Sequence, residues 1–192
     1  MADCGSKIVS GIVKDCKTIN APIGVDKDLI LVNYDDFDRI ATYLEANRID
    51  TPEAENEGGL TAIMLKLGAI QHIFEGTDYS VIPSISTEVK ELGDAWYIHN
   101  IIFTAYNKTA KARKVIEDLG NSRVIAICID RSTGLYELFG ADQGLKISAL
   151  ERQYTGAQNS NFYTVTLTTP DIAVVRESTI GELAISVVTA IV

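Results

Sequence analysis

Apolar and β-branched residues recur along this chain in short runs, and most gaps between the runs hold Gly, Pro, Asn or Asp. Such runs are typical of β-strands, and the intervening residues favour turns. We therefore predict roughly nine to eleven strands. They fall at residues 7–13, 29–32, 60–74 with a break at Gly68, 81–90, 95–106, 123–130, 135–139, 145–151, 162–168, 172–175 and 183–192. This spacing predicts a mainly β fold, an antiparallel β-sandwich or barrel.

Two helices are predicted, and the shorter one lies near the start of the chain, where apolar residues recur with helical spacing. The apolar stripe of this helix comprises Phe37, Ile40, Ala41 and Leu44. Asn33 or Asp35 suits the N-cap, and Asn47 suits the end.

One longer helix is predicted between the strands at 95–106 and 123–130, where it would flank the sheets. Its apolar stripe comprises Val115, Ile116 and Leu119. Asn107 is the expected N-cap, and Gly120 is the expected glycine just beyond the C-terminus. Lysines and arginines occupy much of the remaining surface, so we expect the stripe to cover the sandwich.

The chain length suits one domain, spanning residues 1–192. Two parts of this domain are expected to extend from its body. The first is an N-terminal arm with a strand, residues 1–32, and the second is an acidic loop, residues 46–59. The loop carries three alternating acids, Glu53, Glu55 and Glu57.

With a formal net charge of −9, the chain is not expected to bind nucleic acid tightly, because phosphate binding requires lysine and arginine. The charge remains compatible with nucleic acid that passes without sticking. The opening "MADCGSK" lacks the pattern of a secretory leader, and no apolar run reaches membrane-spanning length. We expect synthesis in a cytoplasm, no membrane partner, and Cys4 and Cys16 in the reduced state.

The residue types that usually carry catalysis are scattered. His72 and His99 each stand alone on a strand, and Cys128 lies in an apolar run. The acids near position 36 fail the calcium-loop pattern, because Ile40, Ala41 and Asn47 occupy its required positions. Glycines 134, 140 and 144 match no phosphate-binding motif and are expected in turns. We predict no catalytic residue, no cofactor and no metal.

Strand surface is abundant instead. The runs at 60–74 and 95–106 exceed the usual strand length of about five or six residues. Unpaired edges of this length would promote aggregation in a monomer. We therefore expect the edges to be paired or covered in an assembly, through sheet extension between subunits.

Four stretches in this order resemble phage major tail tube proteins, especially those of phages and prophages of gut bacteria. They are "MADCGSKIVSG", "LILVNYDDFDR", "LTAIMLKLGAIQHIFEG" and the block from "AWYIHNIIFTAYNKTAKARKVIEDLGNSRVIAICID" through "GLYELFGADQGLKI" to "FYTVTLTTPD". The likeness runs over most of the chain, and the order of the motifs carries it rather than any single one.

The resemblance implies a β-sandwich or barrel with a flanking helix, acting as a virion structural protein in the phage tail. Copies form rings, typically hexameric, that self-assemble by stacking into a hollow tube. Inner sheets of neighbouring copies join into one barrel, DNA passes through the lumen, and other tail proteins close the ends. An acidic lumen would repel phosphate and let DNA pass. The resemblance also implies that the loop with Glu53, Glu55 and Glu57 contacts the next ring or lines the lumen, and a solvated flap stays open as the alternative.

Two alternatives stay open at this point. The tube subunit of a contractile injection system, or a tail connector or terminator, would share this architecture. A carbohydrate- or small-molecule-binding β-sandwich belongs to another class and would need an aromatic stacking platform. The candidates for that platform are Trp96, Tyr97, Tyr106 and Tyr136. An enzyme would require a pairing of Cys128 with a histidine.

Overall fold

A computed structural model describes residues 24–50, 58–89, 95–106, 109–152, 162–170 and 177–189. The strands are β1 (Asp28–Asn33), β2 (Leu60–Leu65), β3 (His72–Glu75), β4 (Val81–Val89), β5 (Ala95–Ala105), β6 (Val124–Ile129), β7 (Tyr136–Phe139), β8 (Lys146–Glu151), β9 (Tyr163–Thr168) and β10 (Glu182–Thr189). The helical elements are η1 (Tyr34–Asp36), α2 (Arg39–Thr42), η2 (Glu45–Asn47) and α3 (Ala110–Asn121).

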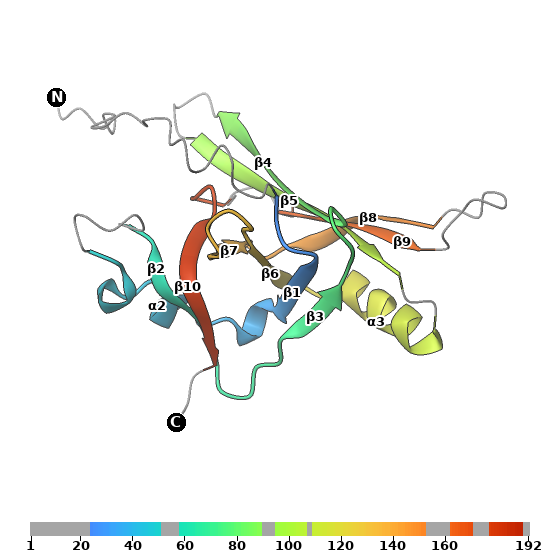
Figure 1. Cartoon of the computed structure of the whole chain (residues 1–192), viewed down its shortest axis with the longest axis horizontal. Helices are drawn as coiled ribbons and strands as arrows, with labels where there is room; N and C mark the ends of the chain where they lie inside the picture. The colour runs from blue at the N-terminus through green and yellow to red at the C-terminus, as the bar shows by residue number, and fades with distance from the viewer. Residues whose placement is uncertain are drawn as a thin grey trace.

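The described strands form two sheets that pack against each other, which gives a mainly β, sandwich-like fold (Figure 1). One sheet has six strands in the order β2-β10-β7-β6-β1-β3, and the other has four in the order β4-β5-β9-β8. Neighbouring strands are antiparallel except β10 and β2, which run parallel. The expectation of an antiparallel fold is therefore wrong for that pair, because a long crossover separates the two strands in sequence.

Strand β6 lies inside the six-stranded sheet and is buried on both faces. Val124, Ala126 and Cys128 belong to one apolar core, whereas Ile125 and Ile127 belong to a second core on the other side. A strand covered on both faces has no solvent side, so its sequence reads as a continuous apolar run rather than an alternation.

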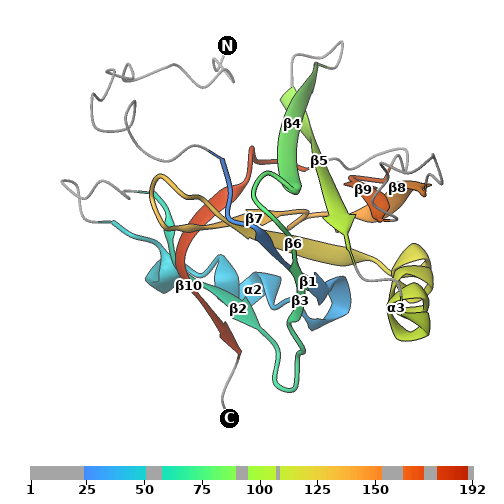
Figure 2. The same ribbon diagram turned by 45° about the vertical axis from the view of Figure 1, so that its right-hand side comes forward.

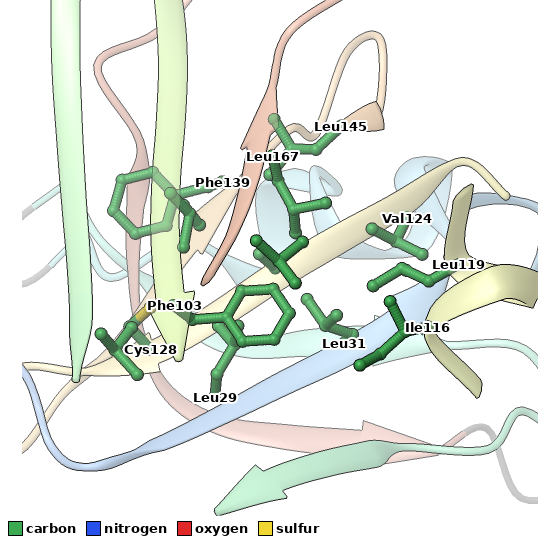
Figure 3. Packing of buried hydrophobic residues seen from close by; sticks show 14 of the residues in the cluster. Leu29, Leu31, Phe103, Ile116, Leu119, Val124, Cys128, Phe139, Leu145 and Leu167 are labelled. Atoms are coloured by element: carbon green, nitrogen blue, oxygen red, sulfur yellow. The ribbon is translucent and has the colours of Figure 1, made fainter. Parts of the chain in front are cut away.

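The first core fills the space between the two sheets and extends under α3 (Figure 3). Its labelled members are Leu29, Leu31, Phe103, Ile116, Leu119, Val124, Cys128, Phe139, Leu145 and Leu167. Full burial of one such large side chain contributes about 1.5–3 kcal/mol. This core therefore fixes the four-stranded sheet and the helix onto the same side of the six-stranded sheet.

The second core lies on the other face of the six-stranded sheet, which is curled. Residues 66–71 connect β2 at one edge to β3 at the opposite edge. In a flat sheet of six strands, the two edge strands would lie roughly 24 Å apart. That distance is about the longest that a fully extended connection of six residues can cover. The connection also contains a turn, with the Ala69 N–H donating to the Lys66 carbonyl at 3.1 Å. The sheet therefore bends, and its concave side holds Leu60, Ile63, Leu65, Ile125 and Ile127.

The helix predicted near the start of the chain is broken into η1, α2 and η2, so its apolar stripe is wrong. Phe37 is buried, but Ile40 is 81% exposed and Leu44 is 53% exposed. Backbone pairing to β2 interrupts the helix, because Asp38 N–H donates to the Met64 carbonyl at 3.0 Å. Asp38 is also the N-cap of α2, in place of the expected Asn33 or Asp35.

The other expected boundaries are partly corrected. Residues 60–74 form two strands instead of one long strand, as the break at Gly68 suggested. Helix α3 begins after Thr109, whose hydroxyl accepts the Ala112 N–H at 3.2 Å. Gly120 lies inside this helix because its last turn continues to Asn121. Pro83 lies on the edge strand β4, and glycines 134, 140 and 144 are confirmed in turns with positive φ.

Several expectations fall outside the described residues. These are the strands at 7–13 and 172–175, the N-cap Asn107, Cys4 and Cys16, and the acids Glu53, Glu55 and Glu57.

Candidate functional site

The outer face of the four-stranded sheet presents mainly hydroxyl, amide and aliphatic side chains. Alternation along each strand places Thr164, Thr166 and Thr168 of β9 on the face opposite the core residues Val165 and Leu167. Strand β5 contributes Asn100, and its partner across the pair is Ser84 of β4. Among the side chains described on this face, the charged ones, Lys146 and Glu151, both belong to the edge strand β8. The middle of the face is therefore uncharged.

Strands β4 and β8 form the two edges of this sheet. Within the described ranges, neither pairs with another strand on its outer side. Strands β4 and β5 rise together from the body as a hairpin (Figure 2). Near the body, Val81 of β4 is buried in the core, but farther along the hairpin Ile85 on the same face is 39% exposed. Ile85 is exposed because β4 is an edge strand, since His99 opposite it on β5 is only 1% exposed.

Helix α3 contacts the first core through two of the three residues in its predicted stripe. Ile116 is 4% exposed and Leu119 is 7% exposed, whereas Val115 is 41% exposed. Val115 lies beside β3, where it lines a groove together with Ile73 and Tyr106.

We expect Ile116→Val to lower the free energy of unfolding by about 0.5–1.5 kcal/mol, because a buried methylene is lost. Val115→Ala should change it by less than about 0.5 kcal/mol in the unassembled protein. Urea unfolding of both variants checks this ordering. Equal losses would contradict the placement of the helix.

A buried carboxylate joins the two sheets. Glu177 is fully buried, and its side chain accepts the Asp142 N–H at 2.8 Å and the Gln143 N–H at 2.9 Å. Its backbone pairs with Tyr97 of β5 through hydrogen bonds of 3.0 and 3.2 Å. Burial raises the pKa of Glu177 to about 7, and the two N–H donors act against this rise. One residue thus ties β5 to the turn between β7 and β8.

Asp142 connects the Glu177 side chain to the segment that contains η1 and α2. Its carboxylate accepts the Ser178 N–H at 2.7 Å and pairs with the Arg39 guanidinium. Its backbone carbonyl accepts the Tyr34 hydroxyl at 2.6 Å. Burial acts to raise the pKa of Asp142, but the Ser178 hydrogen bonds and Arg39 outweigh it, so the pKa lies below its usual value. This carboxyl is therefore ionised at neutral pH.

His99 completes the group of side chains that we call the Glu177 cluster, namely Glu177, Asp142, Arg39, Ser178 and His99. The ring is buried, its Nδ1 accepts the Gly140 N–H at 3.1 Å, and its Nε2 lies 2.8 Å from the Thr179 carbonyl. These partners require a neutral ring with its proton on Nε2. Burial lowers the pKa of His99, although the Thr179 carbonyl opposes that shift. His99 is therefore a core histidine whose two ring nitrogens both have hydrogen-bond partners.

The Glu177 cluster holds the fold together rather than presenting groups to a substrate, since its carboxylates and its imidazole are engaged by backbone groups or by Arg39 and Ser178. Cys128 is fully buried, and burial raises the pKa of its thiol to about 12. A nucleophilic cysteine needs the opposite shift. Among the residues that the structure describes, no three His, Cys, Asp or Glu side chains gather as metal ligands.

The four aromatic residues considered for a stacking platform do not share one surface. Trp96 and Tyr97 are neighbours in β5, so their side chains point to opposite faces of the sheet. Tyr136 belongs to β7 in the other sheet, and the Tyr106 ring meets Phe162 edge-on at 5.8 Å. This arrangement does not favour the binding-module alternative.

Sequence reasoning missed the Glu177 cluster. Its members come from segments separated by as many as 139 positions, Arg39 to Ser178, and no local motif links them. A weak signal was a glutamate at 177 followed by Ser178 and Thr179, side chains that suit turns.

No family model matches the chain, and neither a curated protein nor a solved structure matches it. None of the described helices is long and apolar enough to cross a membrane.

Proposed function

We propose that this protein is the structural subunit of a phage tail tube, in which copies form rings that stack around a lumen for DNA. The observation that carries the proposal is the four-stranded sheet, whose edge strands β4 and β8 have no outer partner among the described residues and whose core-facing side leaves Ile85 exposed at the β4 edge. Pairing β4 of one copy with β8 of the next continues the sheet around a closed ring.

In such a ring, the outer face of this sheet lines the lumen. Its central threonines, serine and asparagine carry no charge, and the whole chain is acidic. A wall without clustered lysine and arginine offers DNA few counter-charges, so the DNA slides instead of binding. Other tail proteins would close the tube ends in the assembled virion, and the subunit itself would be made in the host cytoplasm.

Sedimentation velocity over a concentration series tests the self-association that this function requires. We expect species much larger than one chain to appear as the concentration rises, in the absence of any ligand. A single monomer boundary at every concentration would contradict the proposal.

A second prediction concerns DNA. We expect the assembled protein to leave short duplex DNA unretarded in a gel at physiological salt, because its net charge is −9. Retardation that weakens steeply with added salt would show a basic surface along the DNA path. That result would count against an acidic or neutral lumen.

A further inference from the structure

A groove of about 790 Å³ lies between edge strand β3 and helix α3, below the end of β5. One wall is the helix, which presents Ala112 and Val115. The other is β3 itself, with its exposed Ile73, and Tyr106 lies at the β5 end. Figure 1 shows β3 and α3 on the same side of the molecule. Within the described residues, β3 pairs with β1 alone, so its outer edge carries unpaired backbone groups along the groove.

A strand edge beside an apolar helix suits a particular kind of ligand, an extended peptide that adds as one more strand. Backbone hydrogen bonds to β3 would hold such a peptide. Its alternate side chains would pack against Val115 on the helix side and against Ile73 on the other side. Both residues are substantially exposed, at 41% and 61% respectively.

The chain itself supplies a segment with these properties. Residues 8–13 read "IVSGIV", a β-branched run slightly longer than β3, and Lys7 and Lys14 flank it. At one end of the groove, Asp28 and Glu75 face each other across the β1–β3 pair, and one carboxylate oxygen of Asp28 is buried without a hydrogen-bond partner. Two facing carboxylates repel each other, so a lysine at either end of the segment would relieve them.

We propose that residues 8–13 of one copy add as a strand to the β3 edge of a second copy, in the groove against α3. A second copy is named because the proposed assembly brings copies into contact. Val25 pairs with Asp130, on the β6 side of β1, and the Arg131 N–H donates to the Gly24 carbonyl at 3.1 Å. The chain therefore enters β1 from the side away from the groove. This inference rests on the proposed self-assembly and names one contact within it.

Disulfide mapping between two full-length chains tests the contact. Both chains carry Cys4→Ser and Cys16→Ser, while the fully buried Cys128 stays. One chain carries Val115→Cys, and the other carries a single cysteine at one of the positions 8 to 13. Lys114→Cys is the matched control, since its side chain on the next position of α3 is 73% exposed. Mild oxidation of each mixture and a non-reducing gel measure the heterodimer.

Adjacent strand residues point to opposite sides, and a disulfide requires Cα atoms within about 7 Å. With Val115→Cys, we expect the disulfide-linked heterodimer to form when the second cysteine is at alternate positions of the segment and not at the positions between them. With Lys114→Cys, we expect no heterodimer at any position. Equal yields with both helix cysteines, or none with Val115→Cys, would overturn the proposal.

A further chain carrying both cysteines, at one segment position and at 115, separates the two copies from one. A cross-link that forms only within that chain, at any dilution, would also overturn the proposal. Electron microscopy of the uncoupled mixtures scores rings separately. Rings without the alternating cross-link reject this contact while leaving the tube function standing, whereas an alternating cross-link without rings supports the contact and tells against the tube.

Discussion

Ile85→Asp is expected to weaken ring and tube formation while leaving the unassembled chain folded. Ile85 is 39% exposed on the core-facing side of the edge strand β4. In the proposed ring, a neighbouring copy covers this side chain. Losing the burial of an isoleucine costs about 1.5–3 kcal/mol per contact, and each 1.4 kcal/mol is tenfold in concentration. The lowest concentration that supports assembly should therefore rise at least about tenfold.

Ser84→Asp is the matched control for this variant. Ser84 is the neighbour of Ile85, is also exposed, and lies on the opposite face of the same strand. We expect Ser84→Asp to assemble normally, because in the proposed ring its carboxylate would point into the lumen, where the middle of the wall is uncharged. Circular dichroism of both variants monitors the fold. Normal assembly of Ile85→Asp, or equal loss in both variants, would refute the role given to the hairpin.

Glu177→Gln is expected to lower the free energy of unfolding by about 1–3 kcal/mol at pH 8. The glutamine keeps one acceptor for the Asp142 and Gln143 N–H groups, but its own NH2 then faces the other donor. A buried N–H without an acceptor has the full cost of its desolvation. Urea unfolding below the assembly concentration measures the loss. Glu151→Gln on the exposed side of β8 is the control, and we expect it to change stability by less than about 0.5 kcal/mol.

The decrease in the free energy of unfolding caused by Glu177→Gln should also become larger as the pH falls from 8 to 5. Burial raises the folded-state pKa of Glu177 to about 7, above its ordinary value of 4.5. Between these two values the folded state holds a proton that the unfolded state has released, so wild-type stability falls as the pH rises through this window. Glutamine does not titrate, and the difference between the two proteins should therefore widen toward pH 5 by up to about 3 kcal/mol. A difference that stays constant or narrows toward pH 5 would contradict the raised pKa of Glu177.

The strands could be predicted from the sequence because their signal is local. Residues 124–129 form a continuous apolar run, and the structure shows why, since both faces of β6 meet a core. Pro83 lies on the edge strand β4, which fits its lack of the N–H that an inner strand donates.

The remaining features depend on contacts between distant residues. Ile40 and Leu44 fit a helical stripe, but pairing of Asp36 and Asp38 with β2 broke the helix and left both apolar side chains exposed. The Glu177 cluster was invisible for the same reason, since its hydrogen bonds exist only once β5 and the turn after β7 lie together. The parallel pairing of β10 with β2 also has no local signature.

Negative-stain electron microscopy of the purified chain over a concentration series tests the central claim most directly. We expect rings with a central hole at intermediate concentration and stacked tubes above it. Isolated particles of monomer size at every concentration, from a chain that circular dichroism shows to be folded, would contradict it.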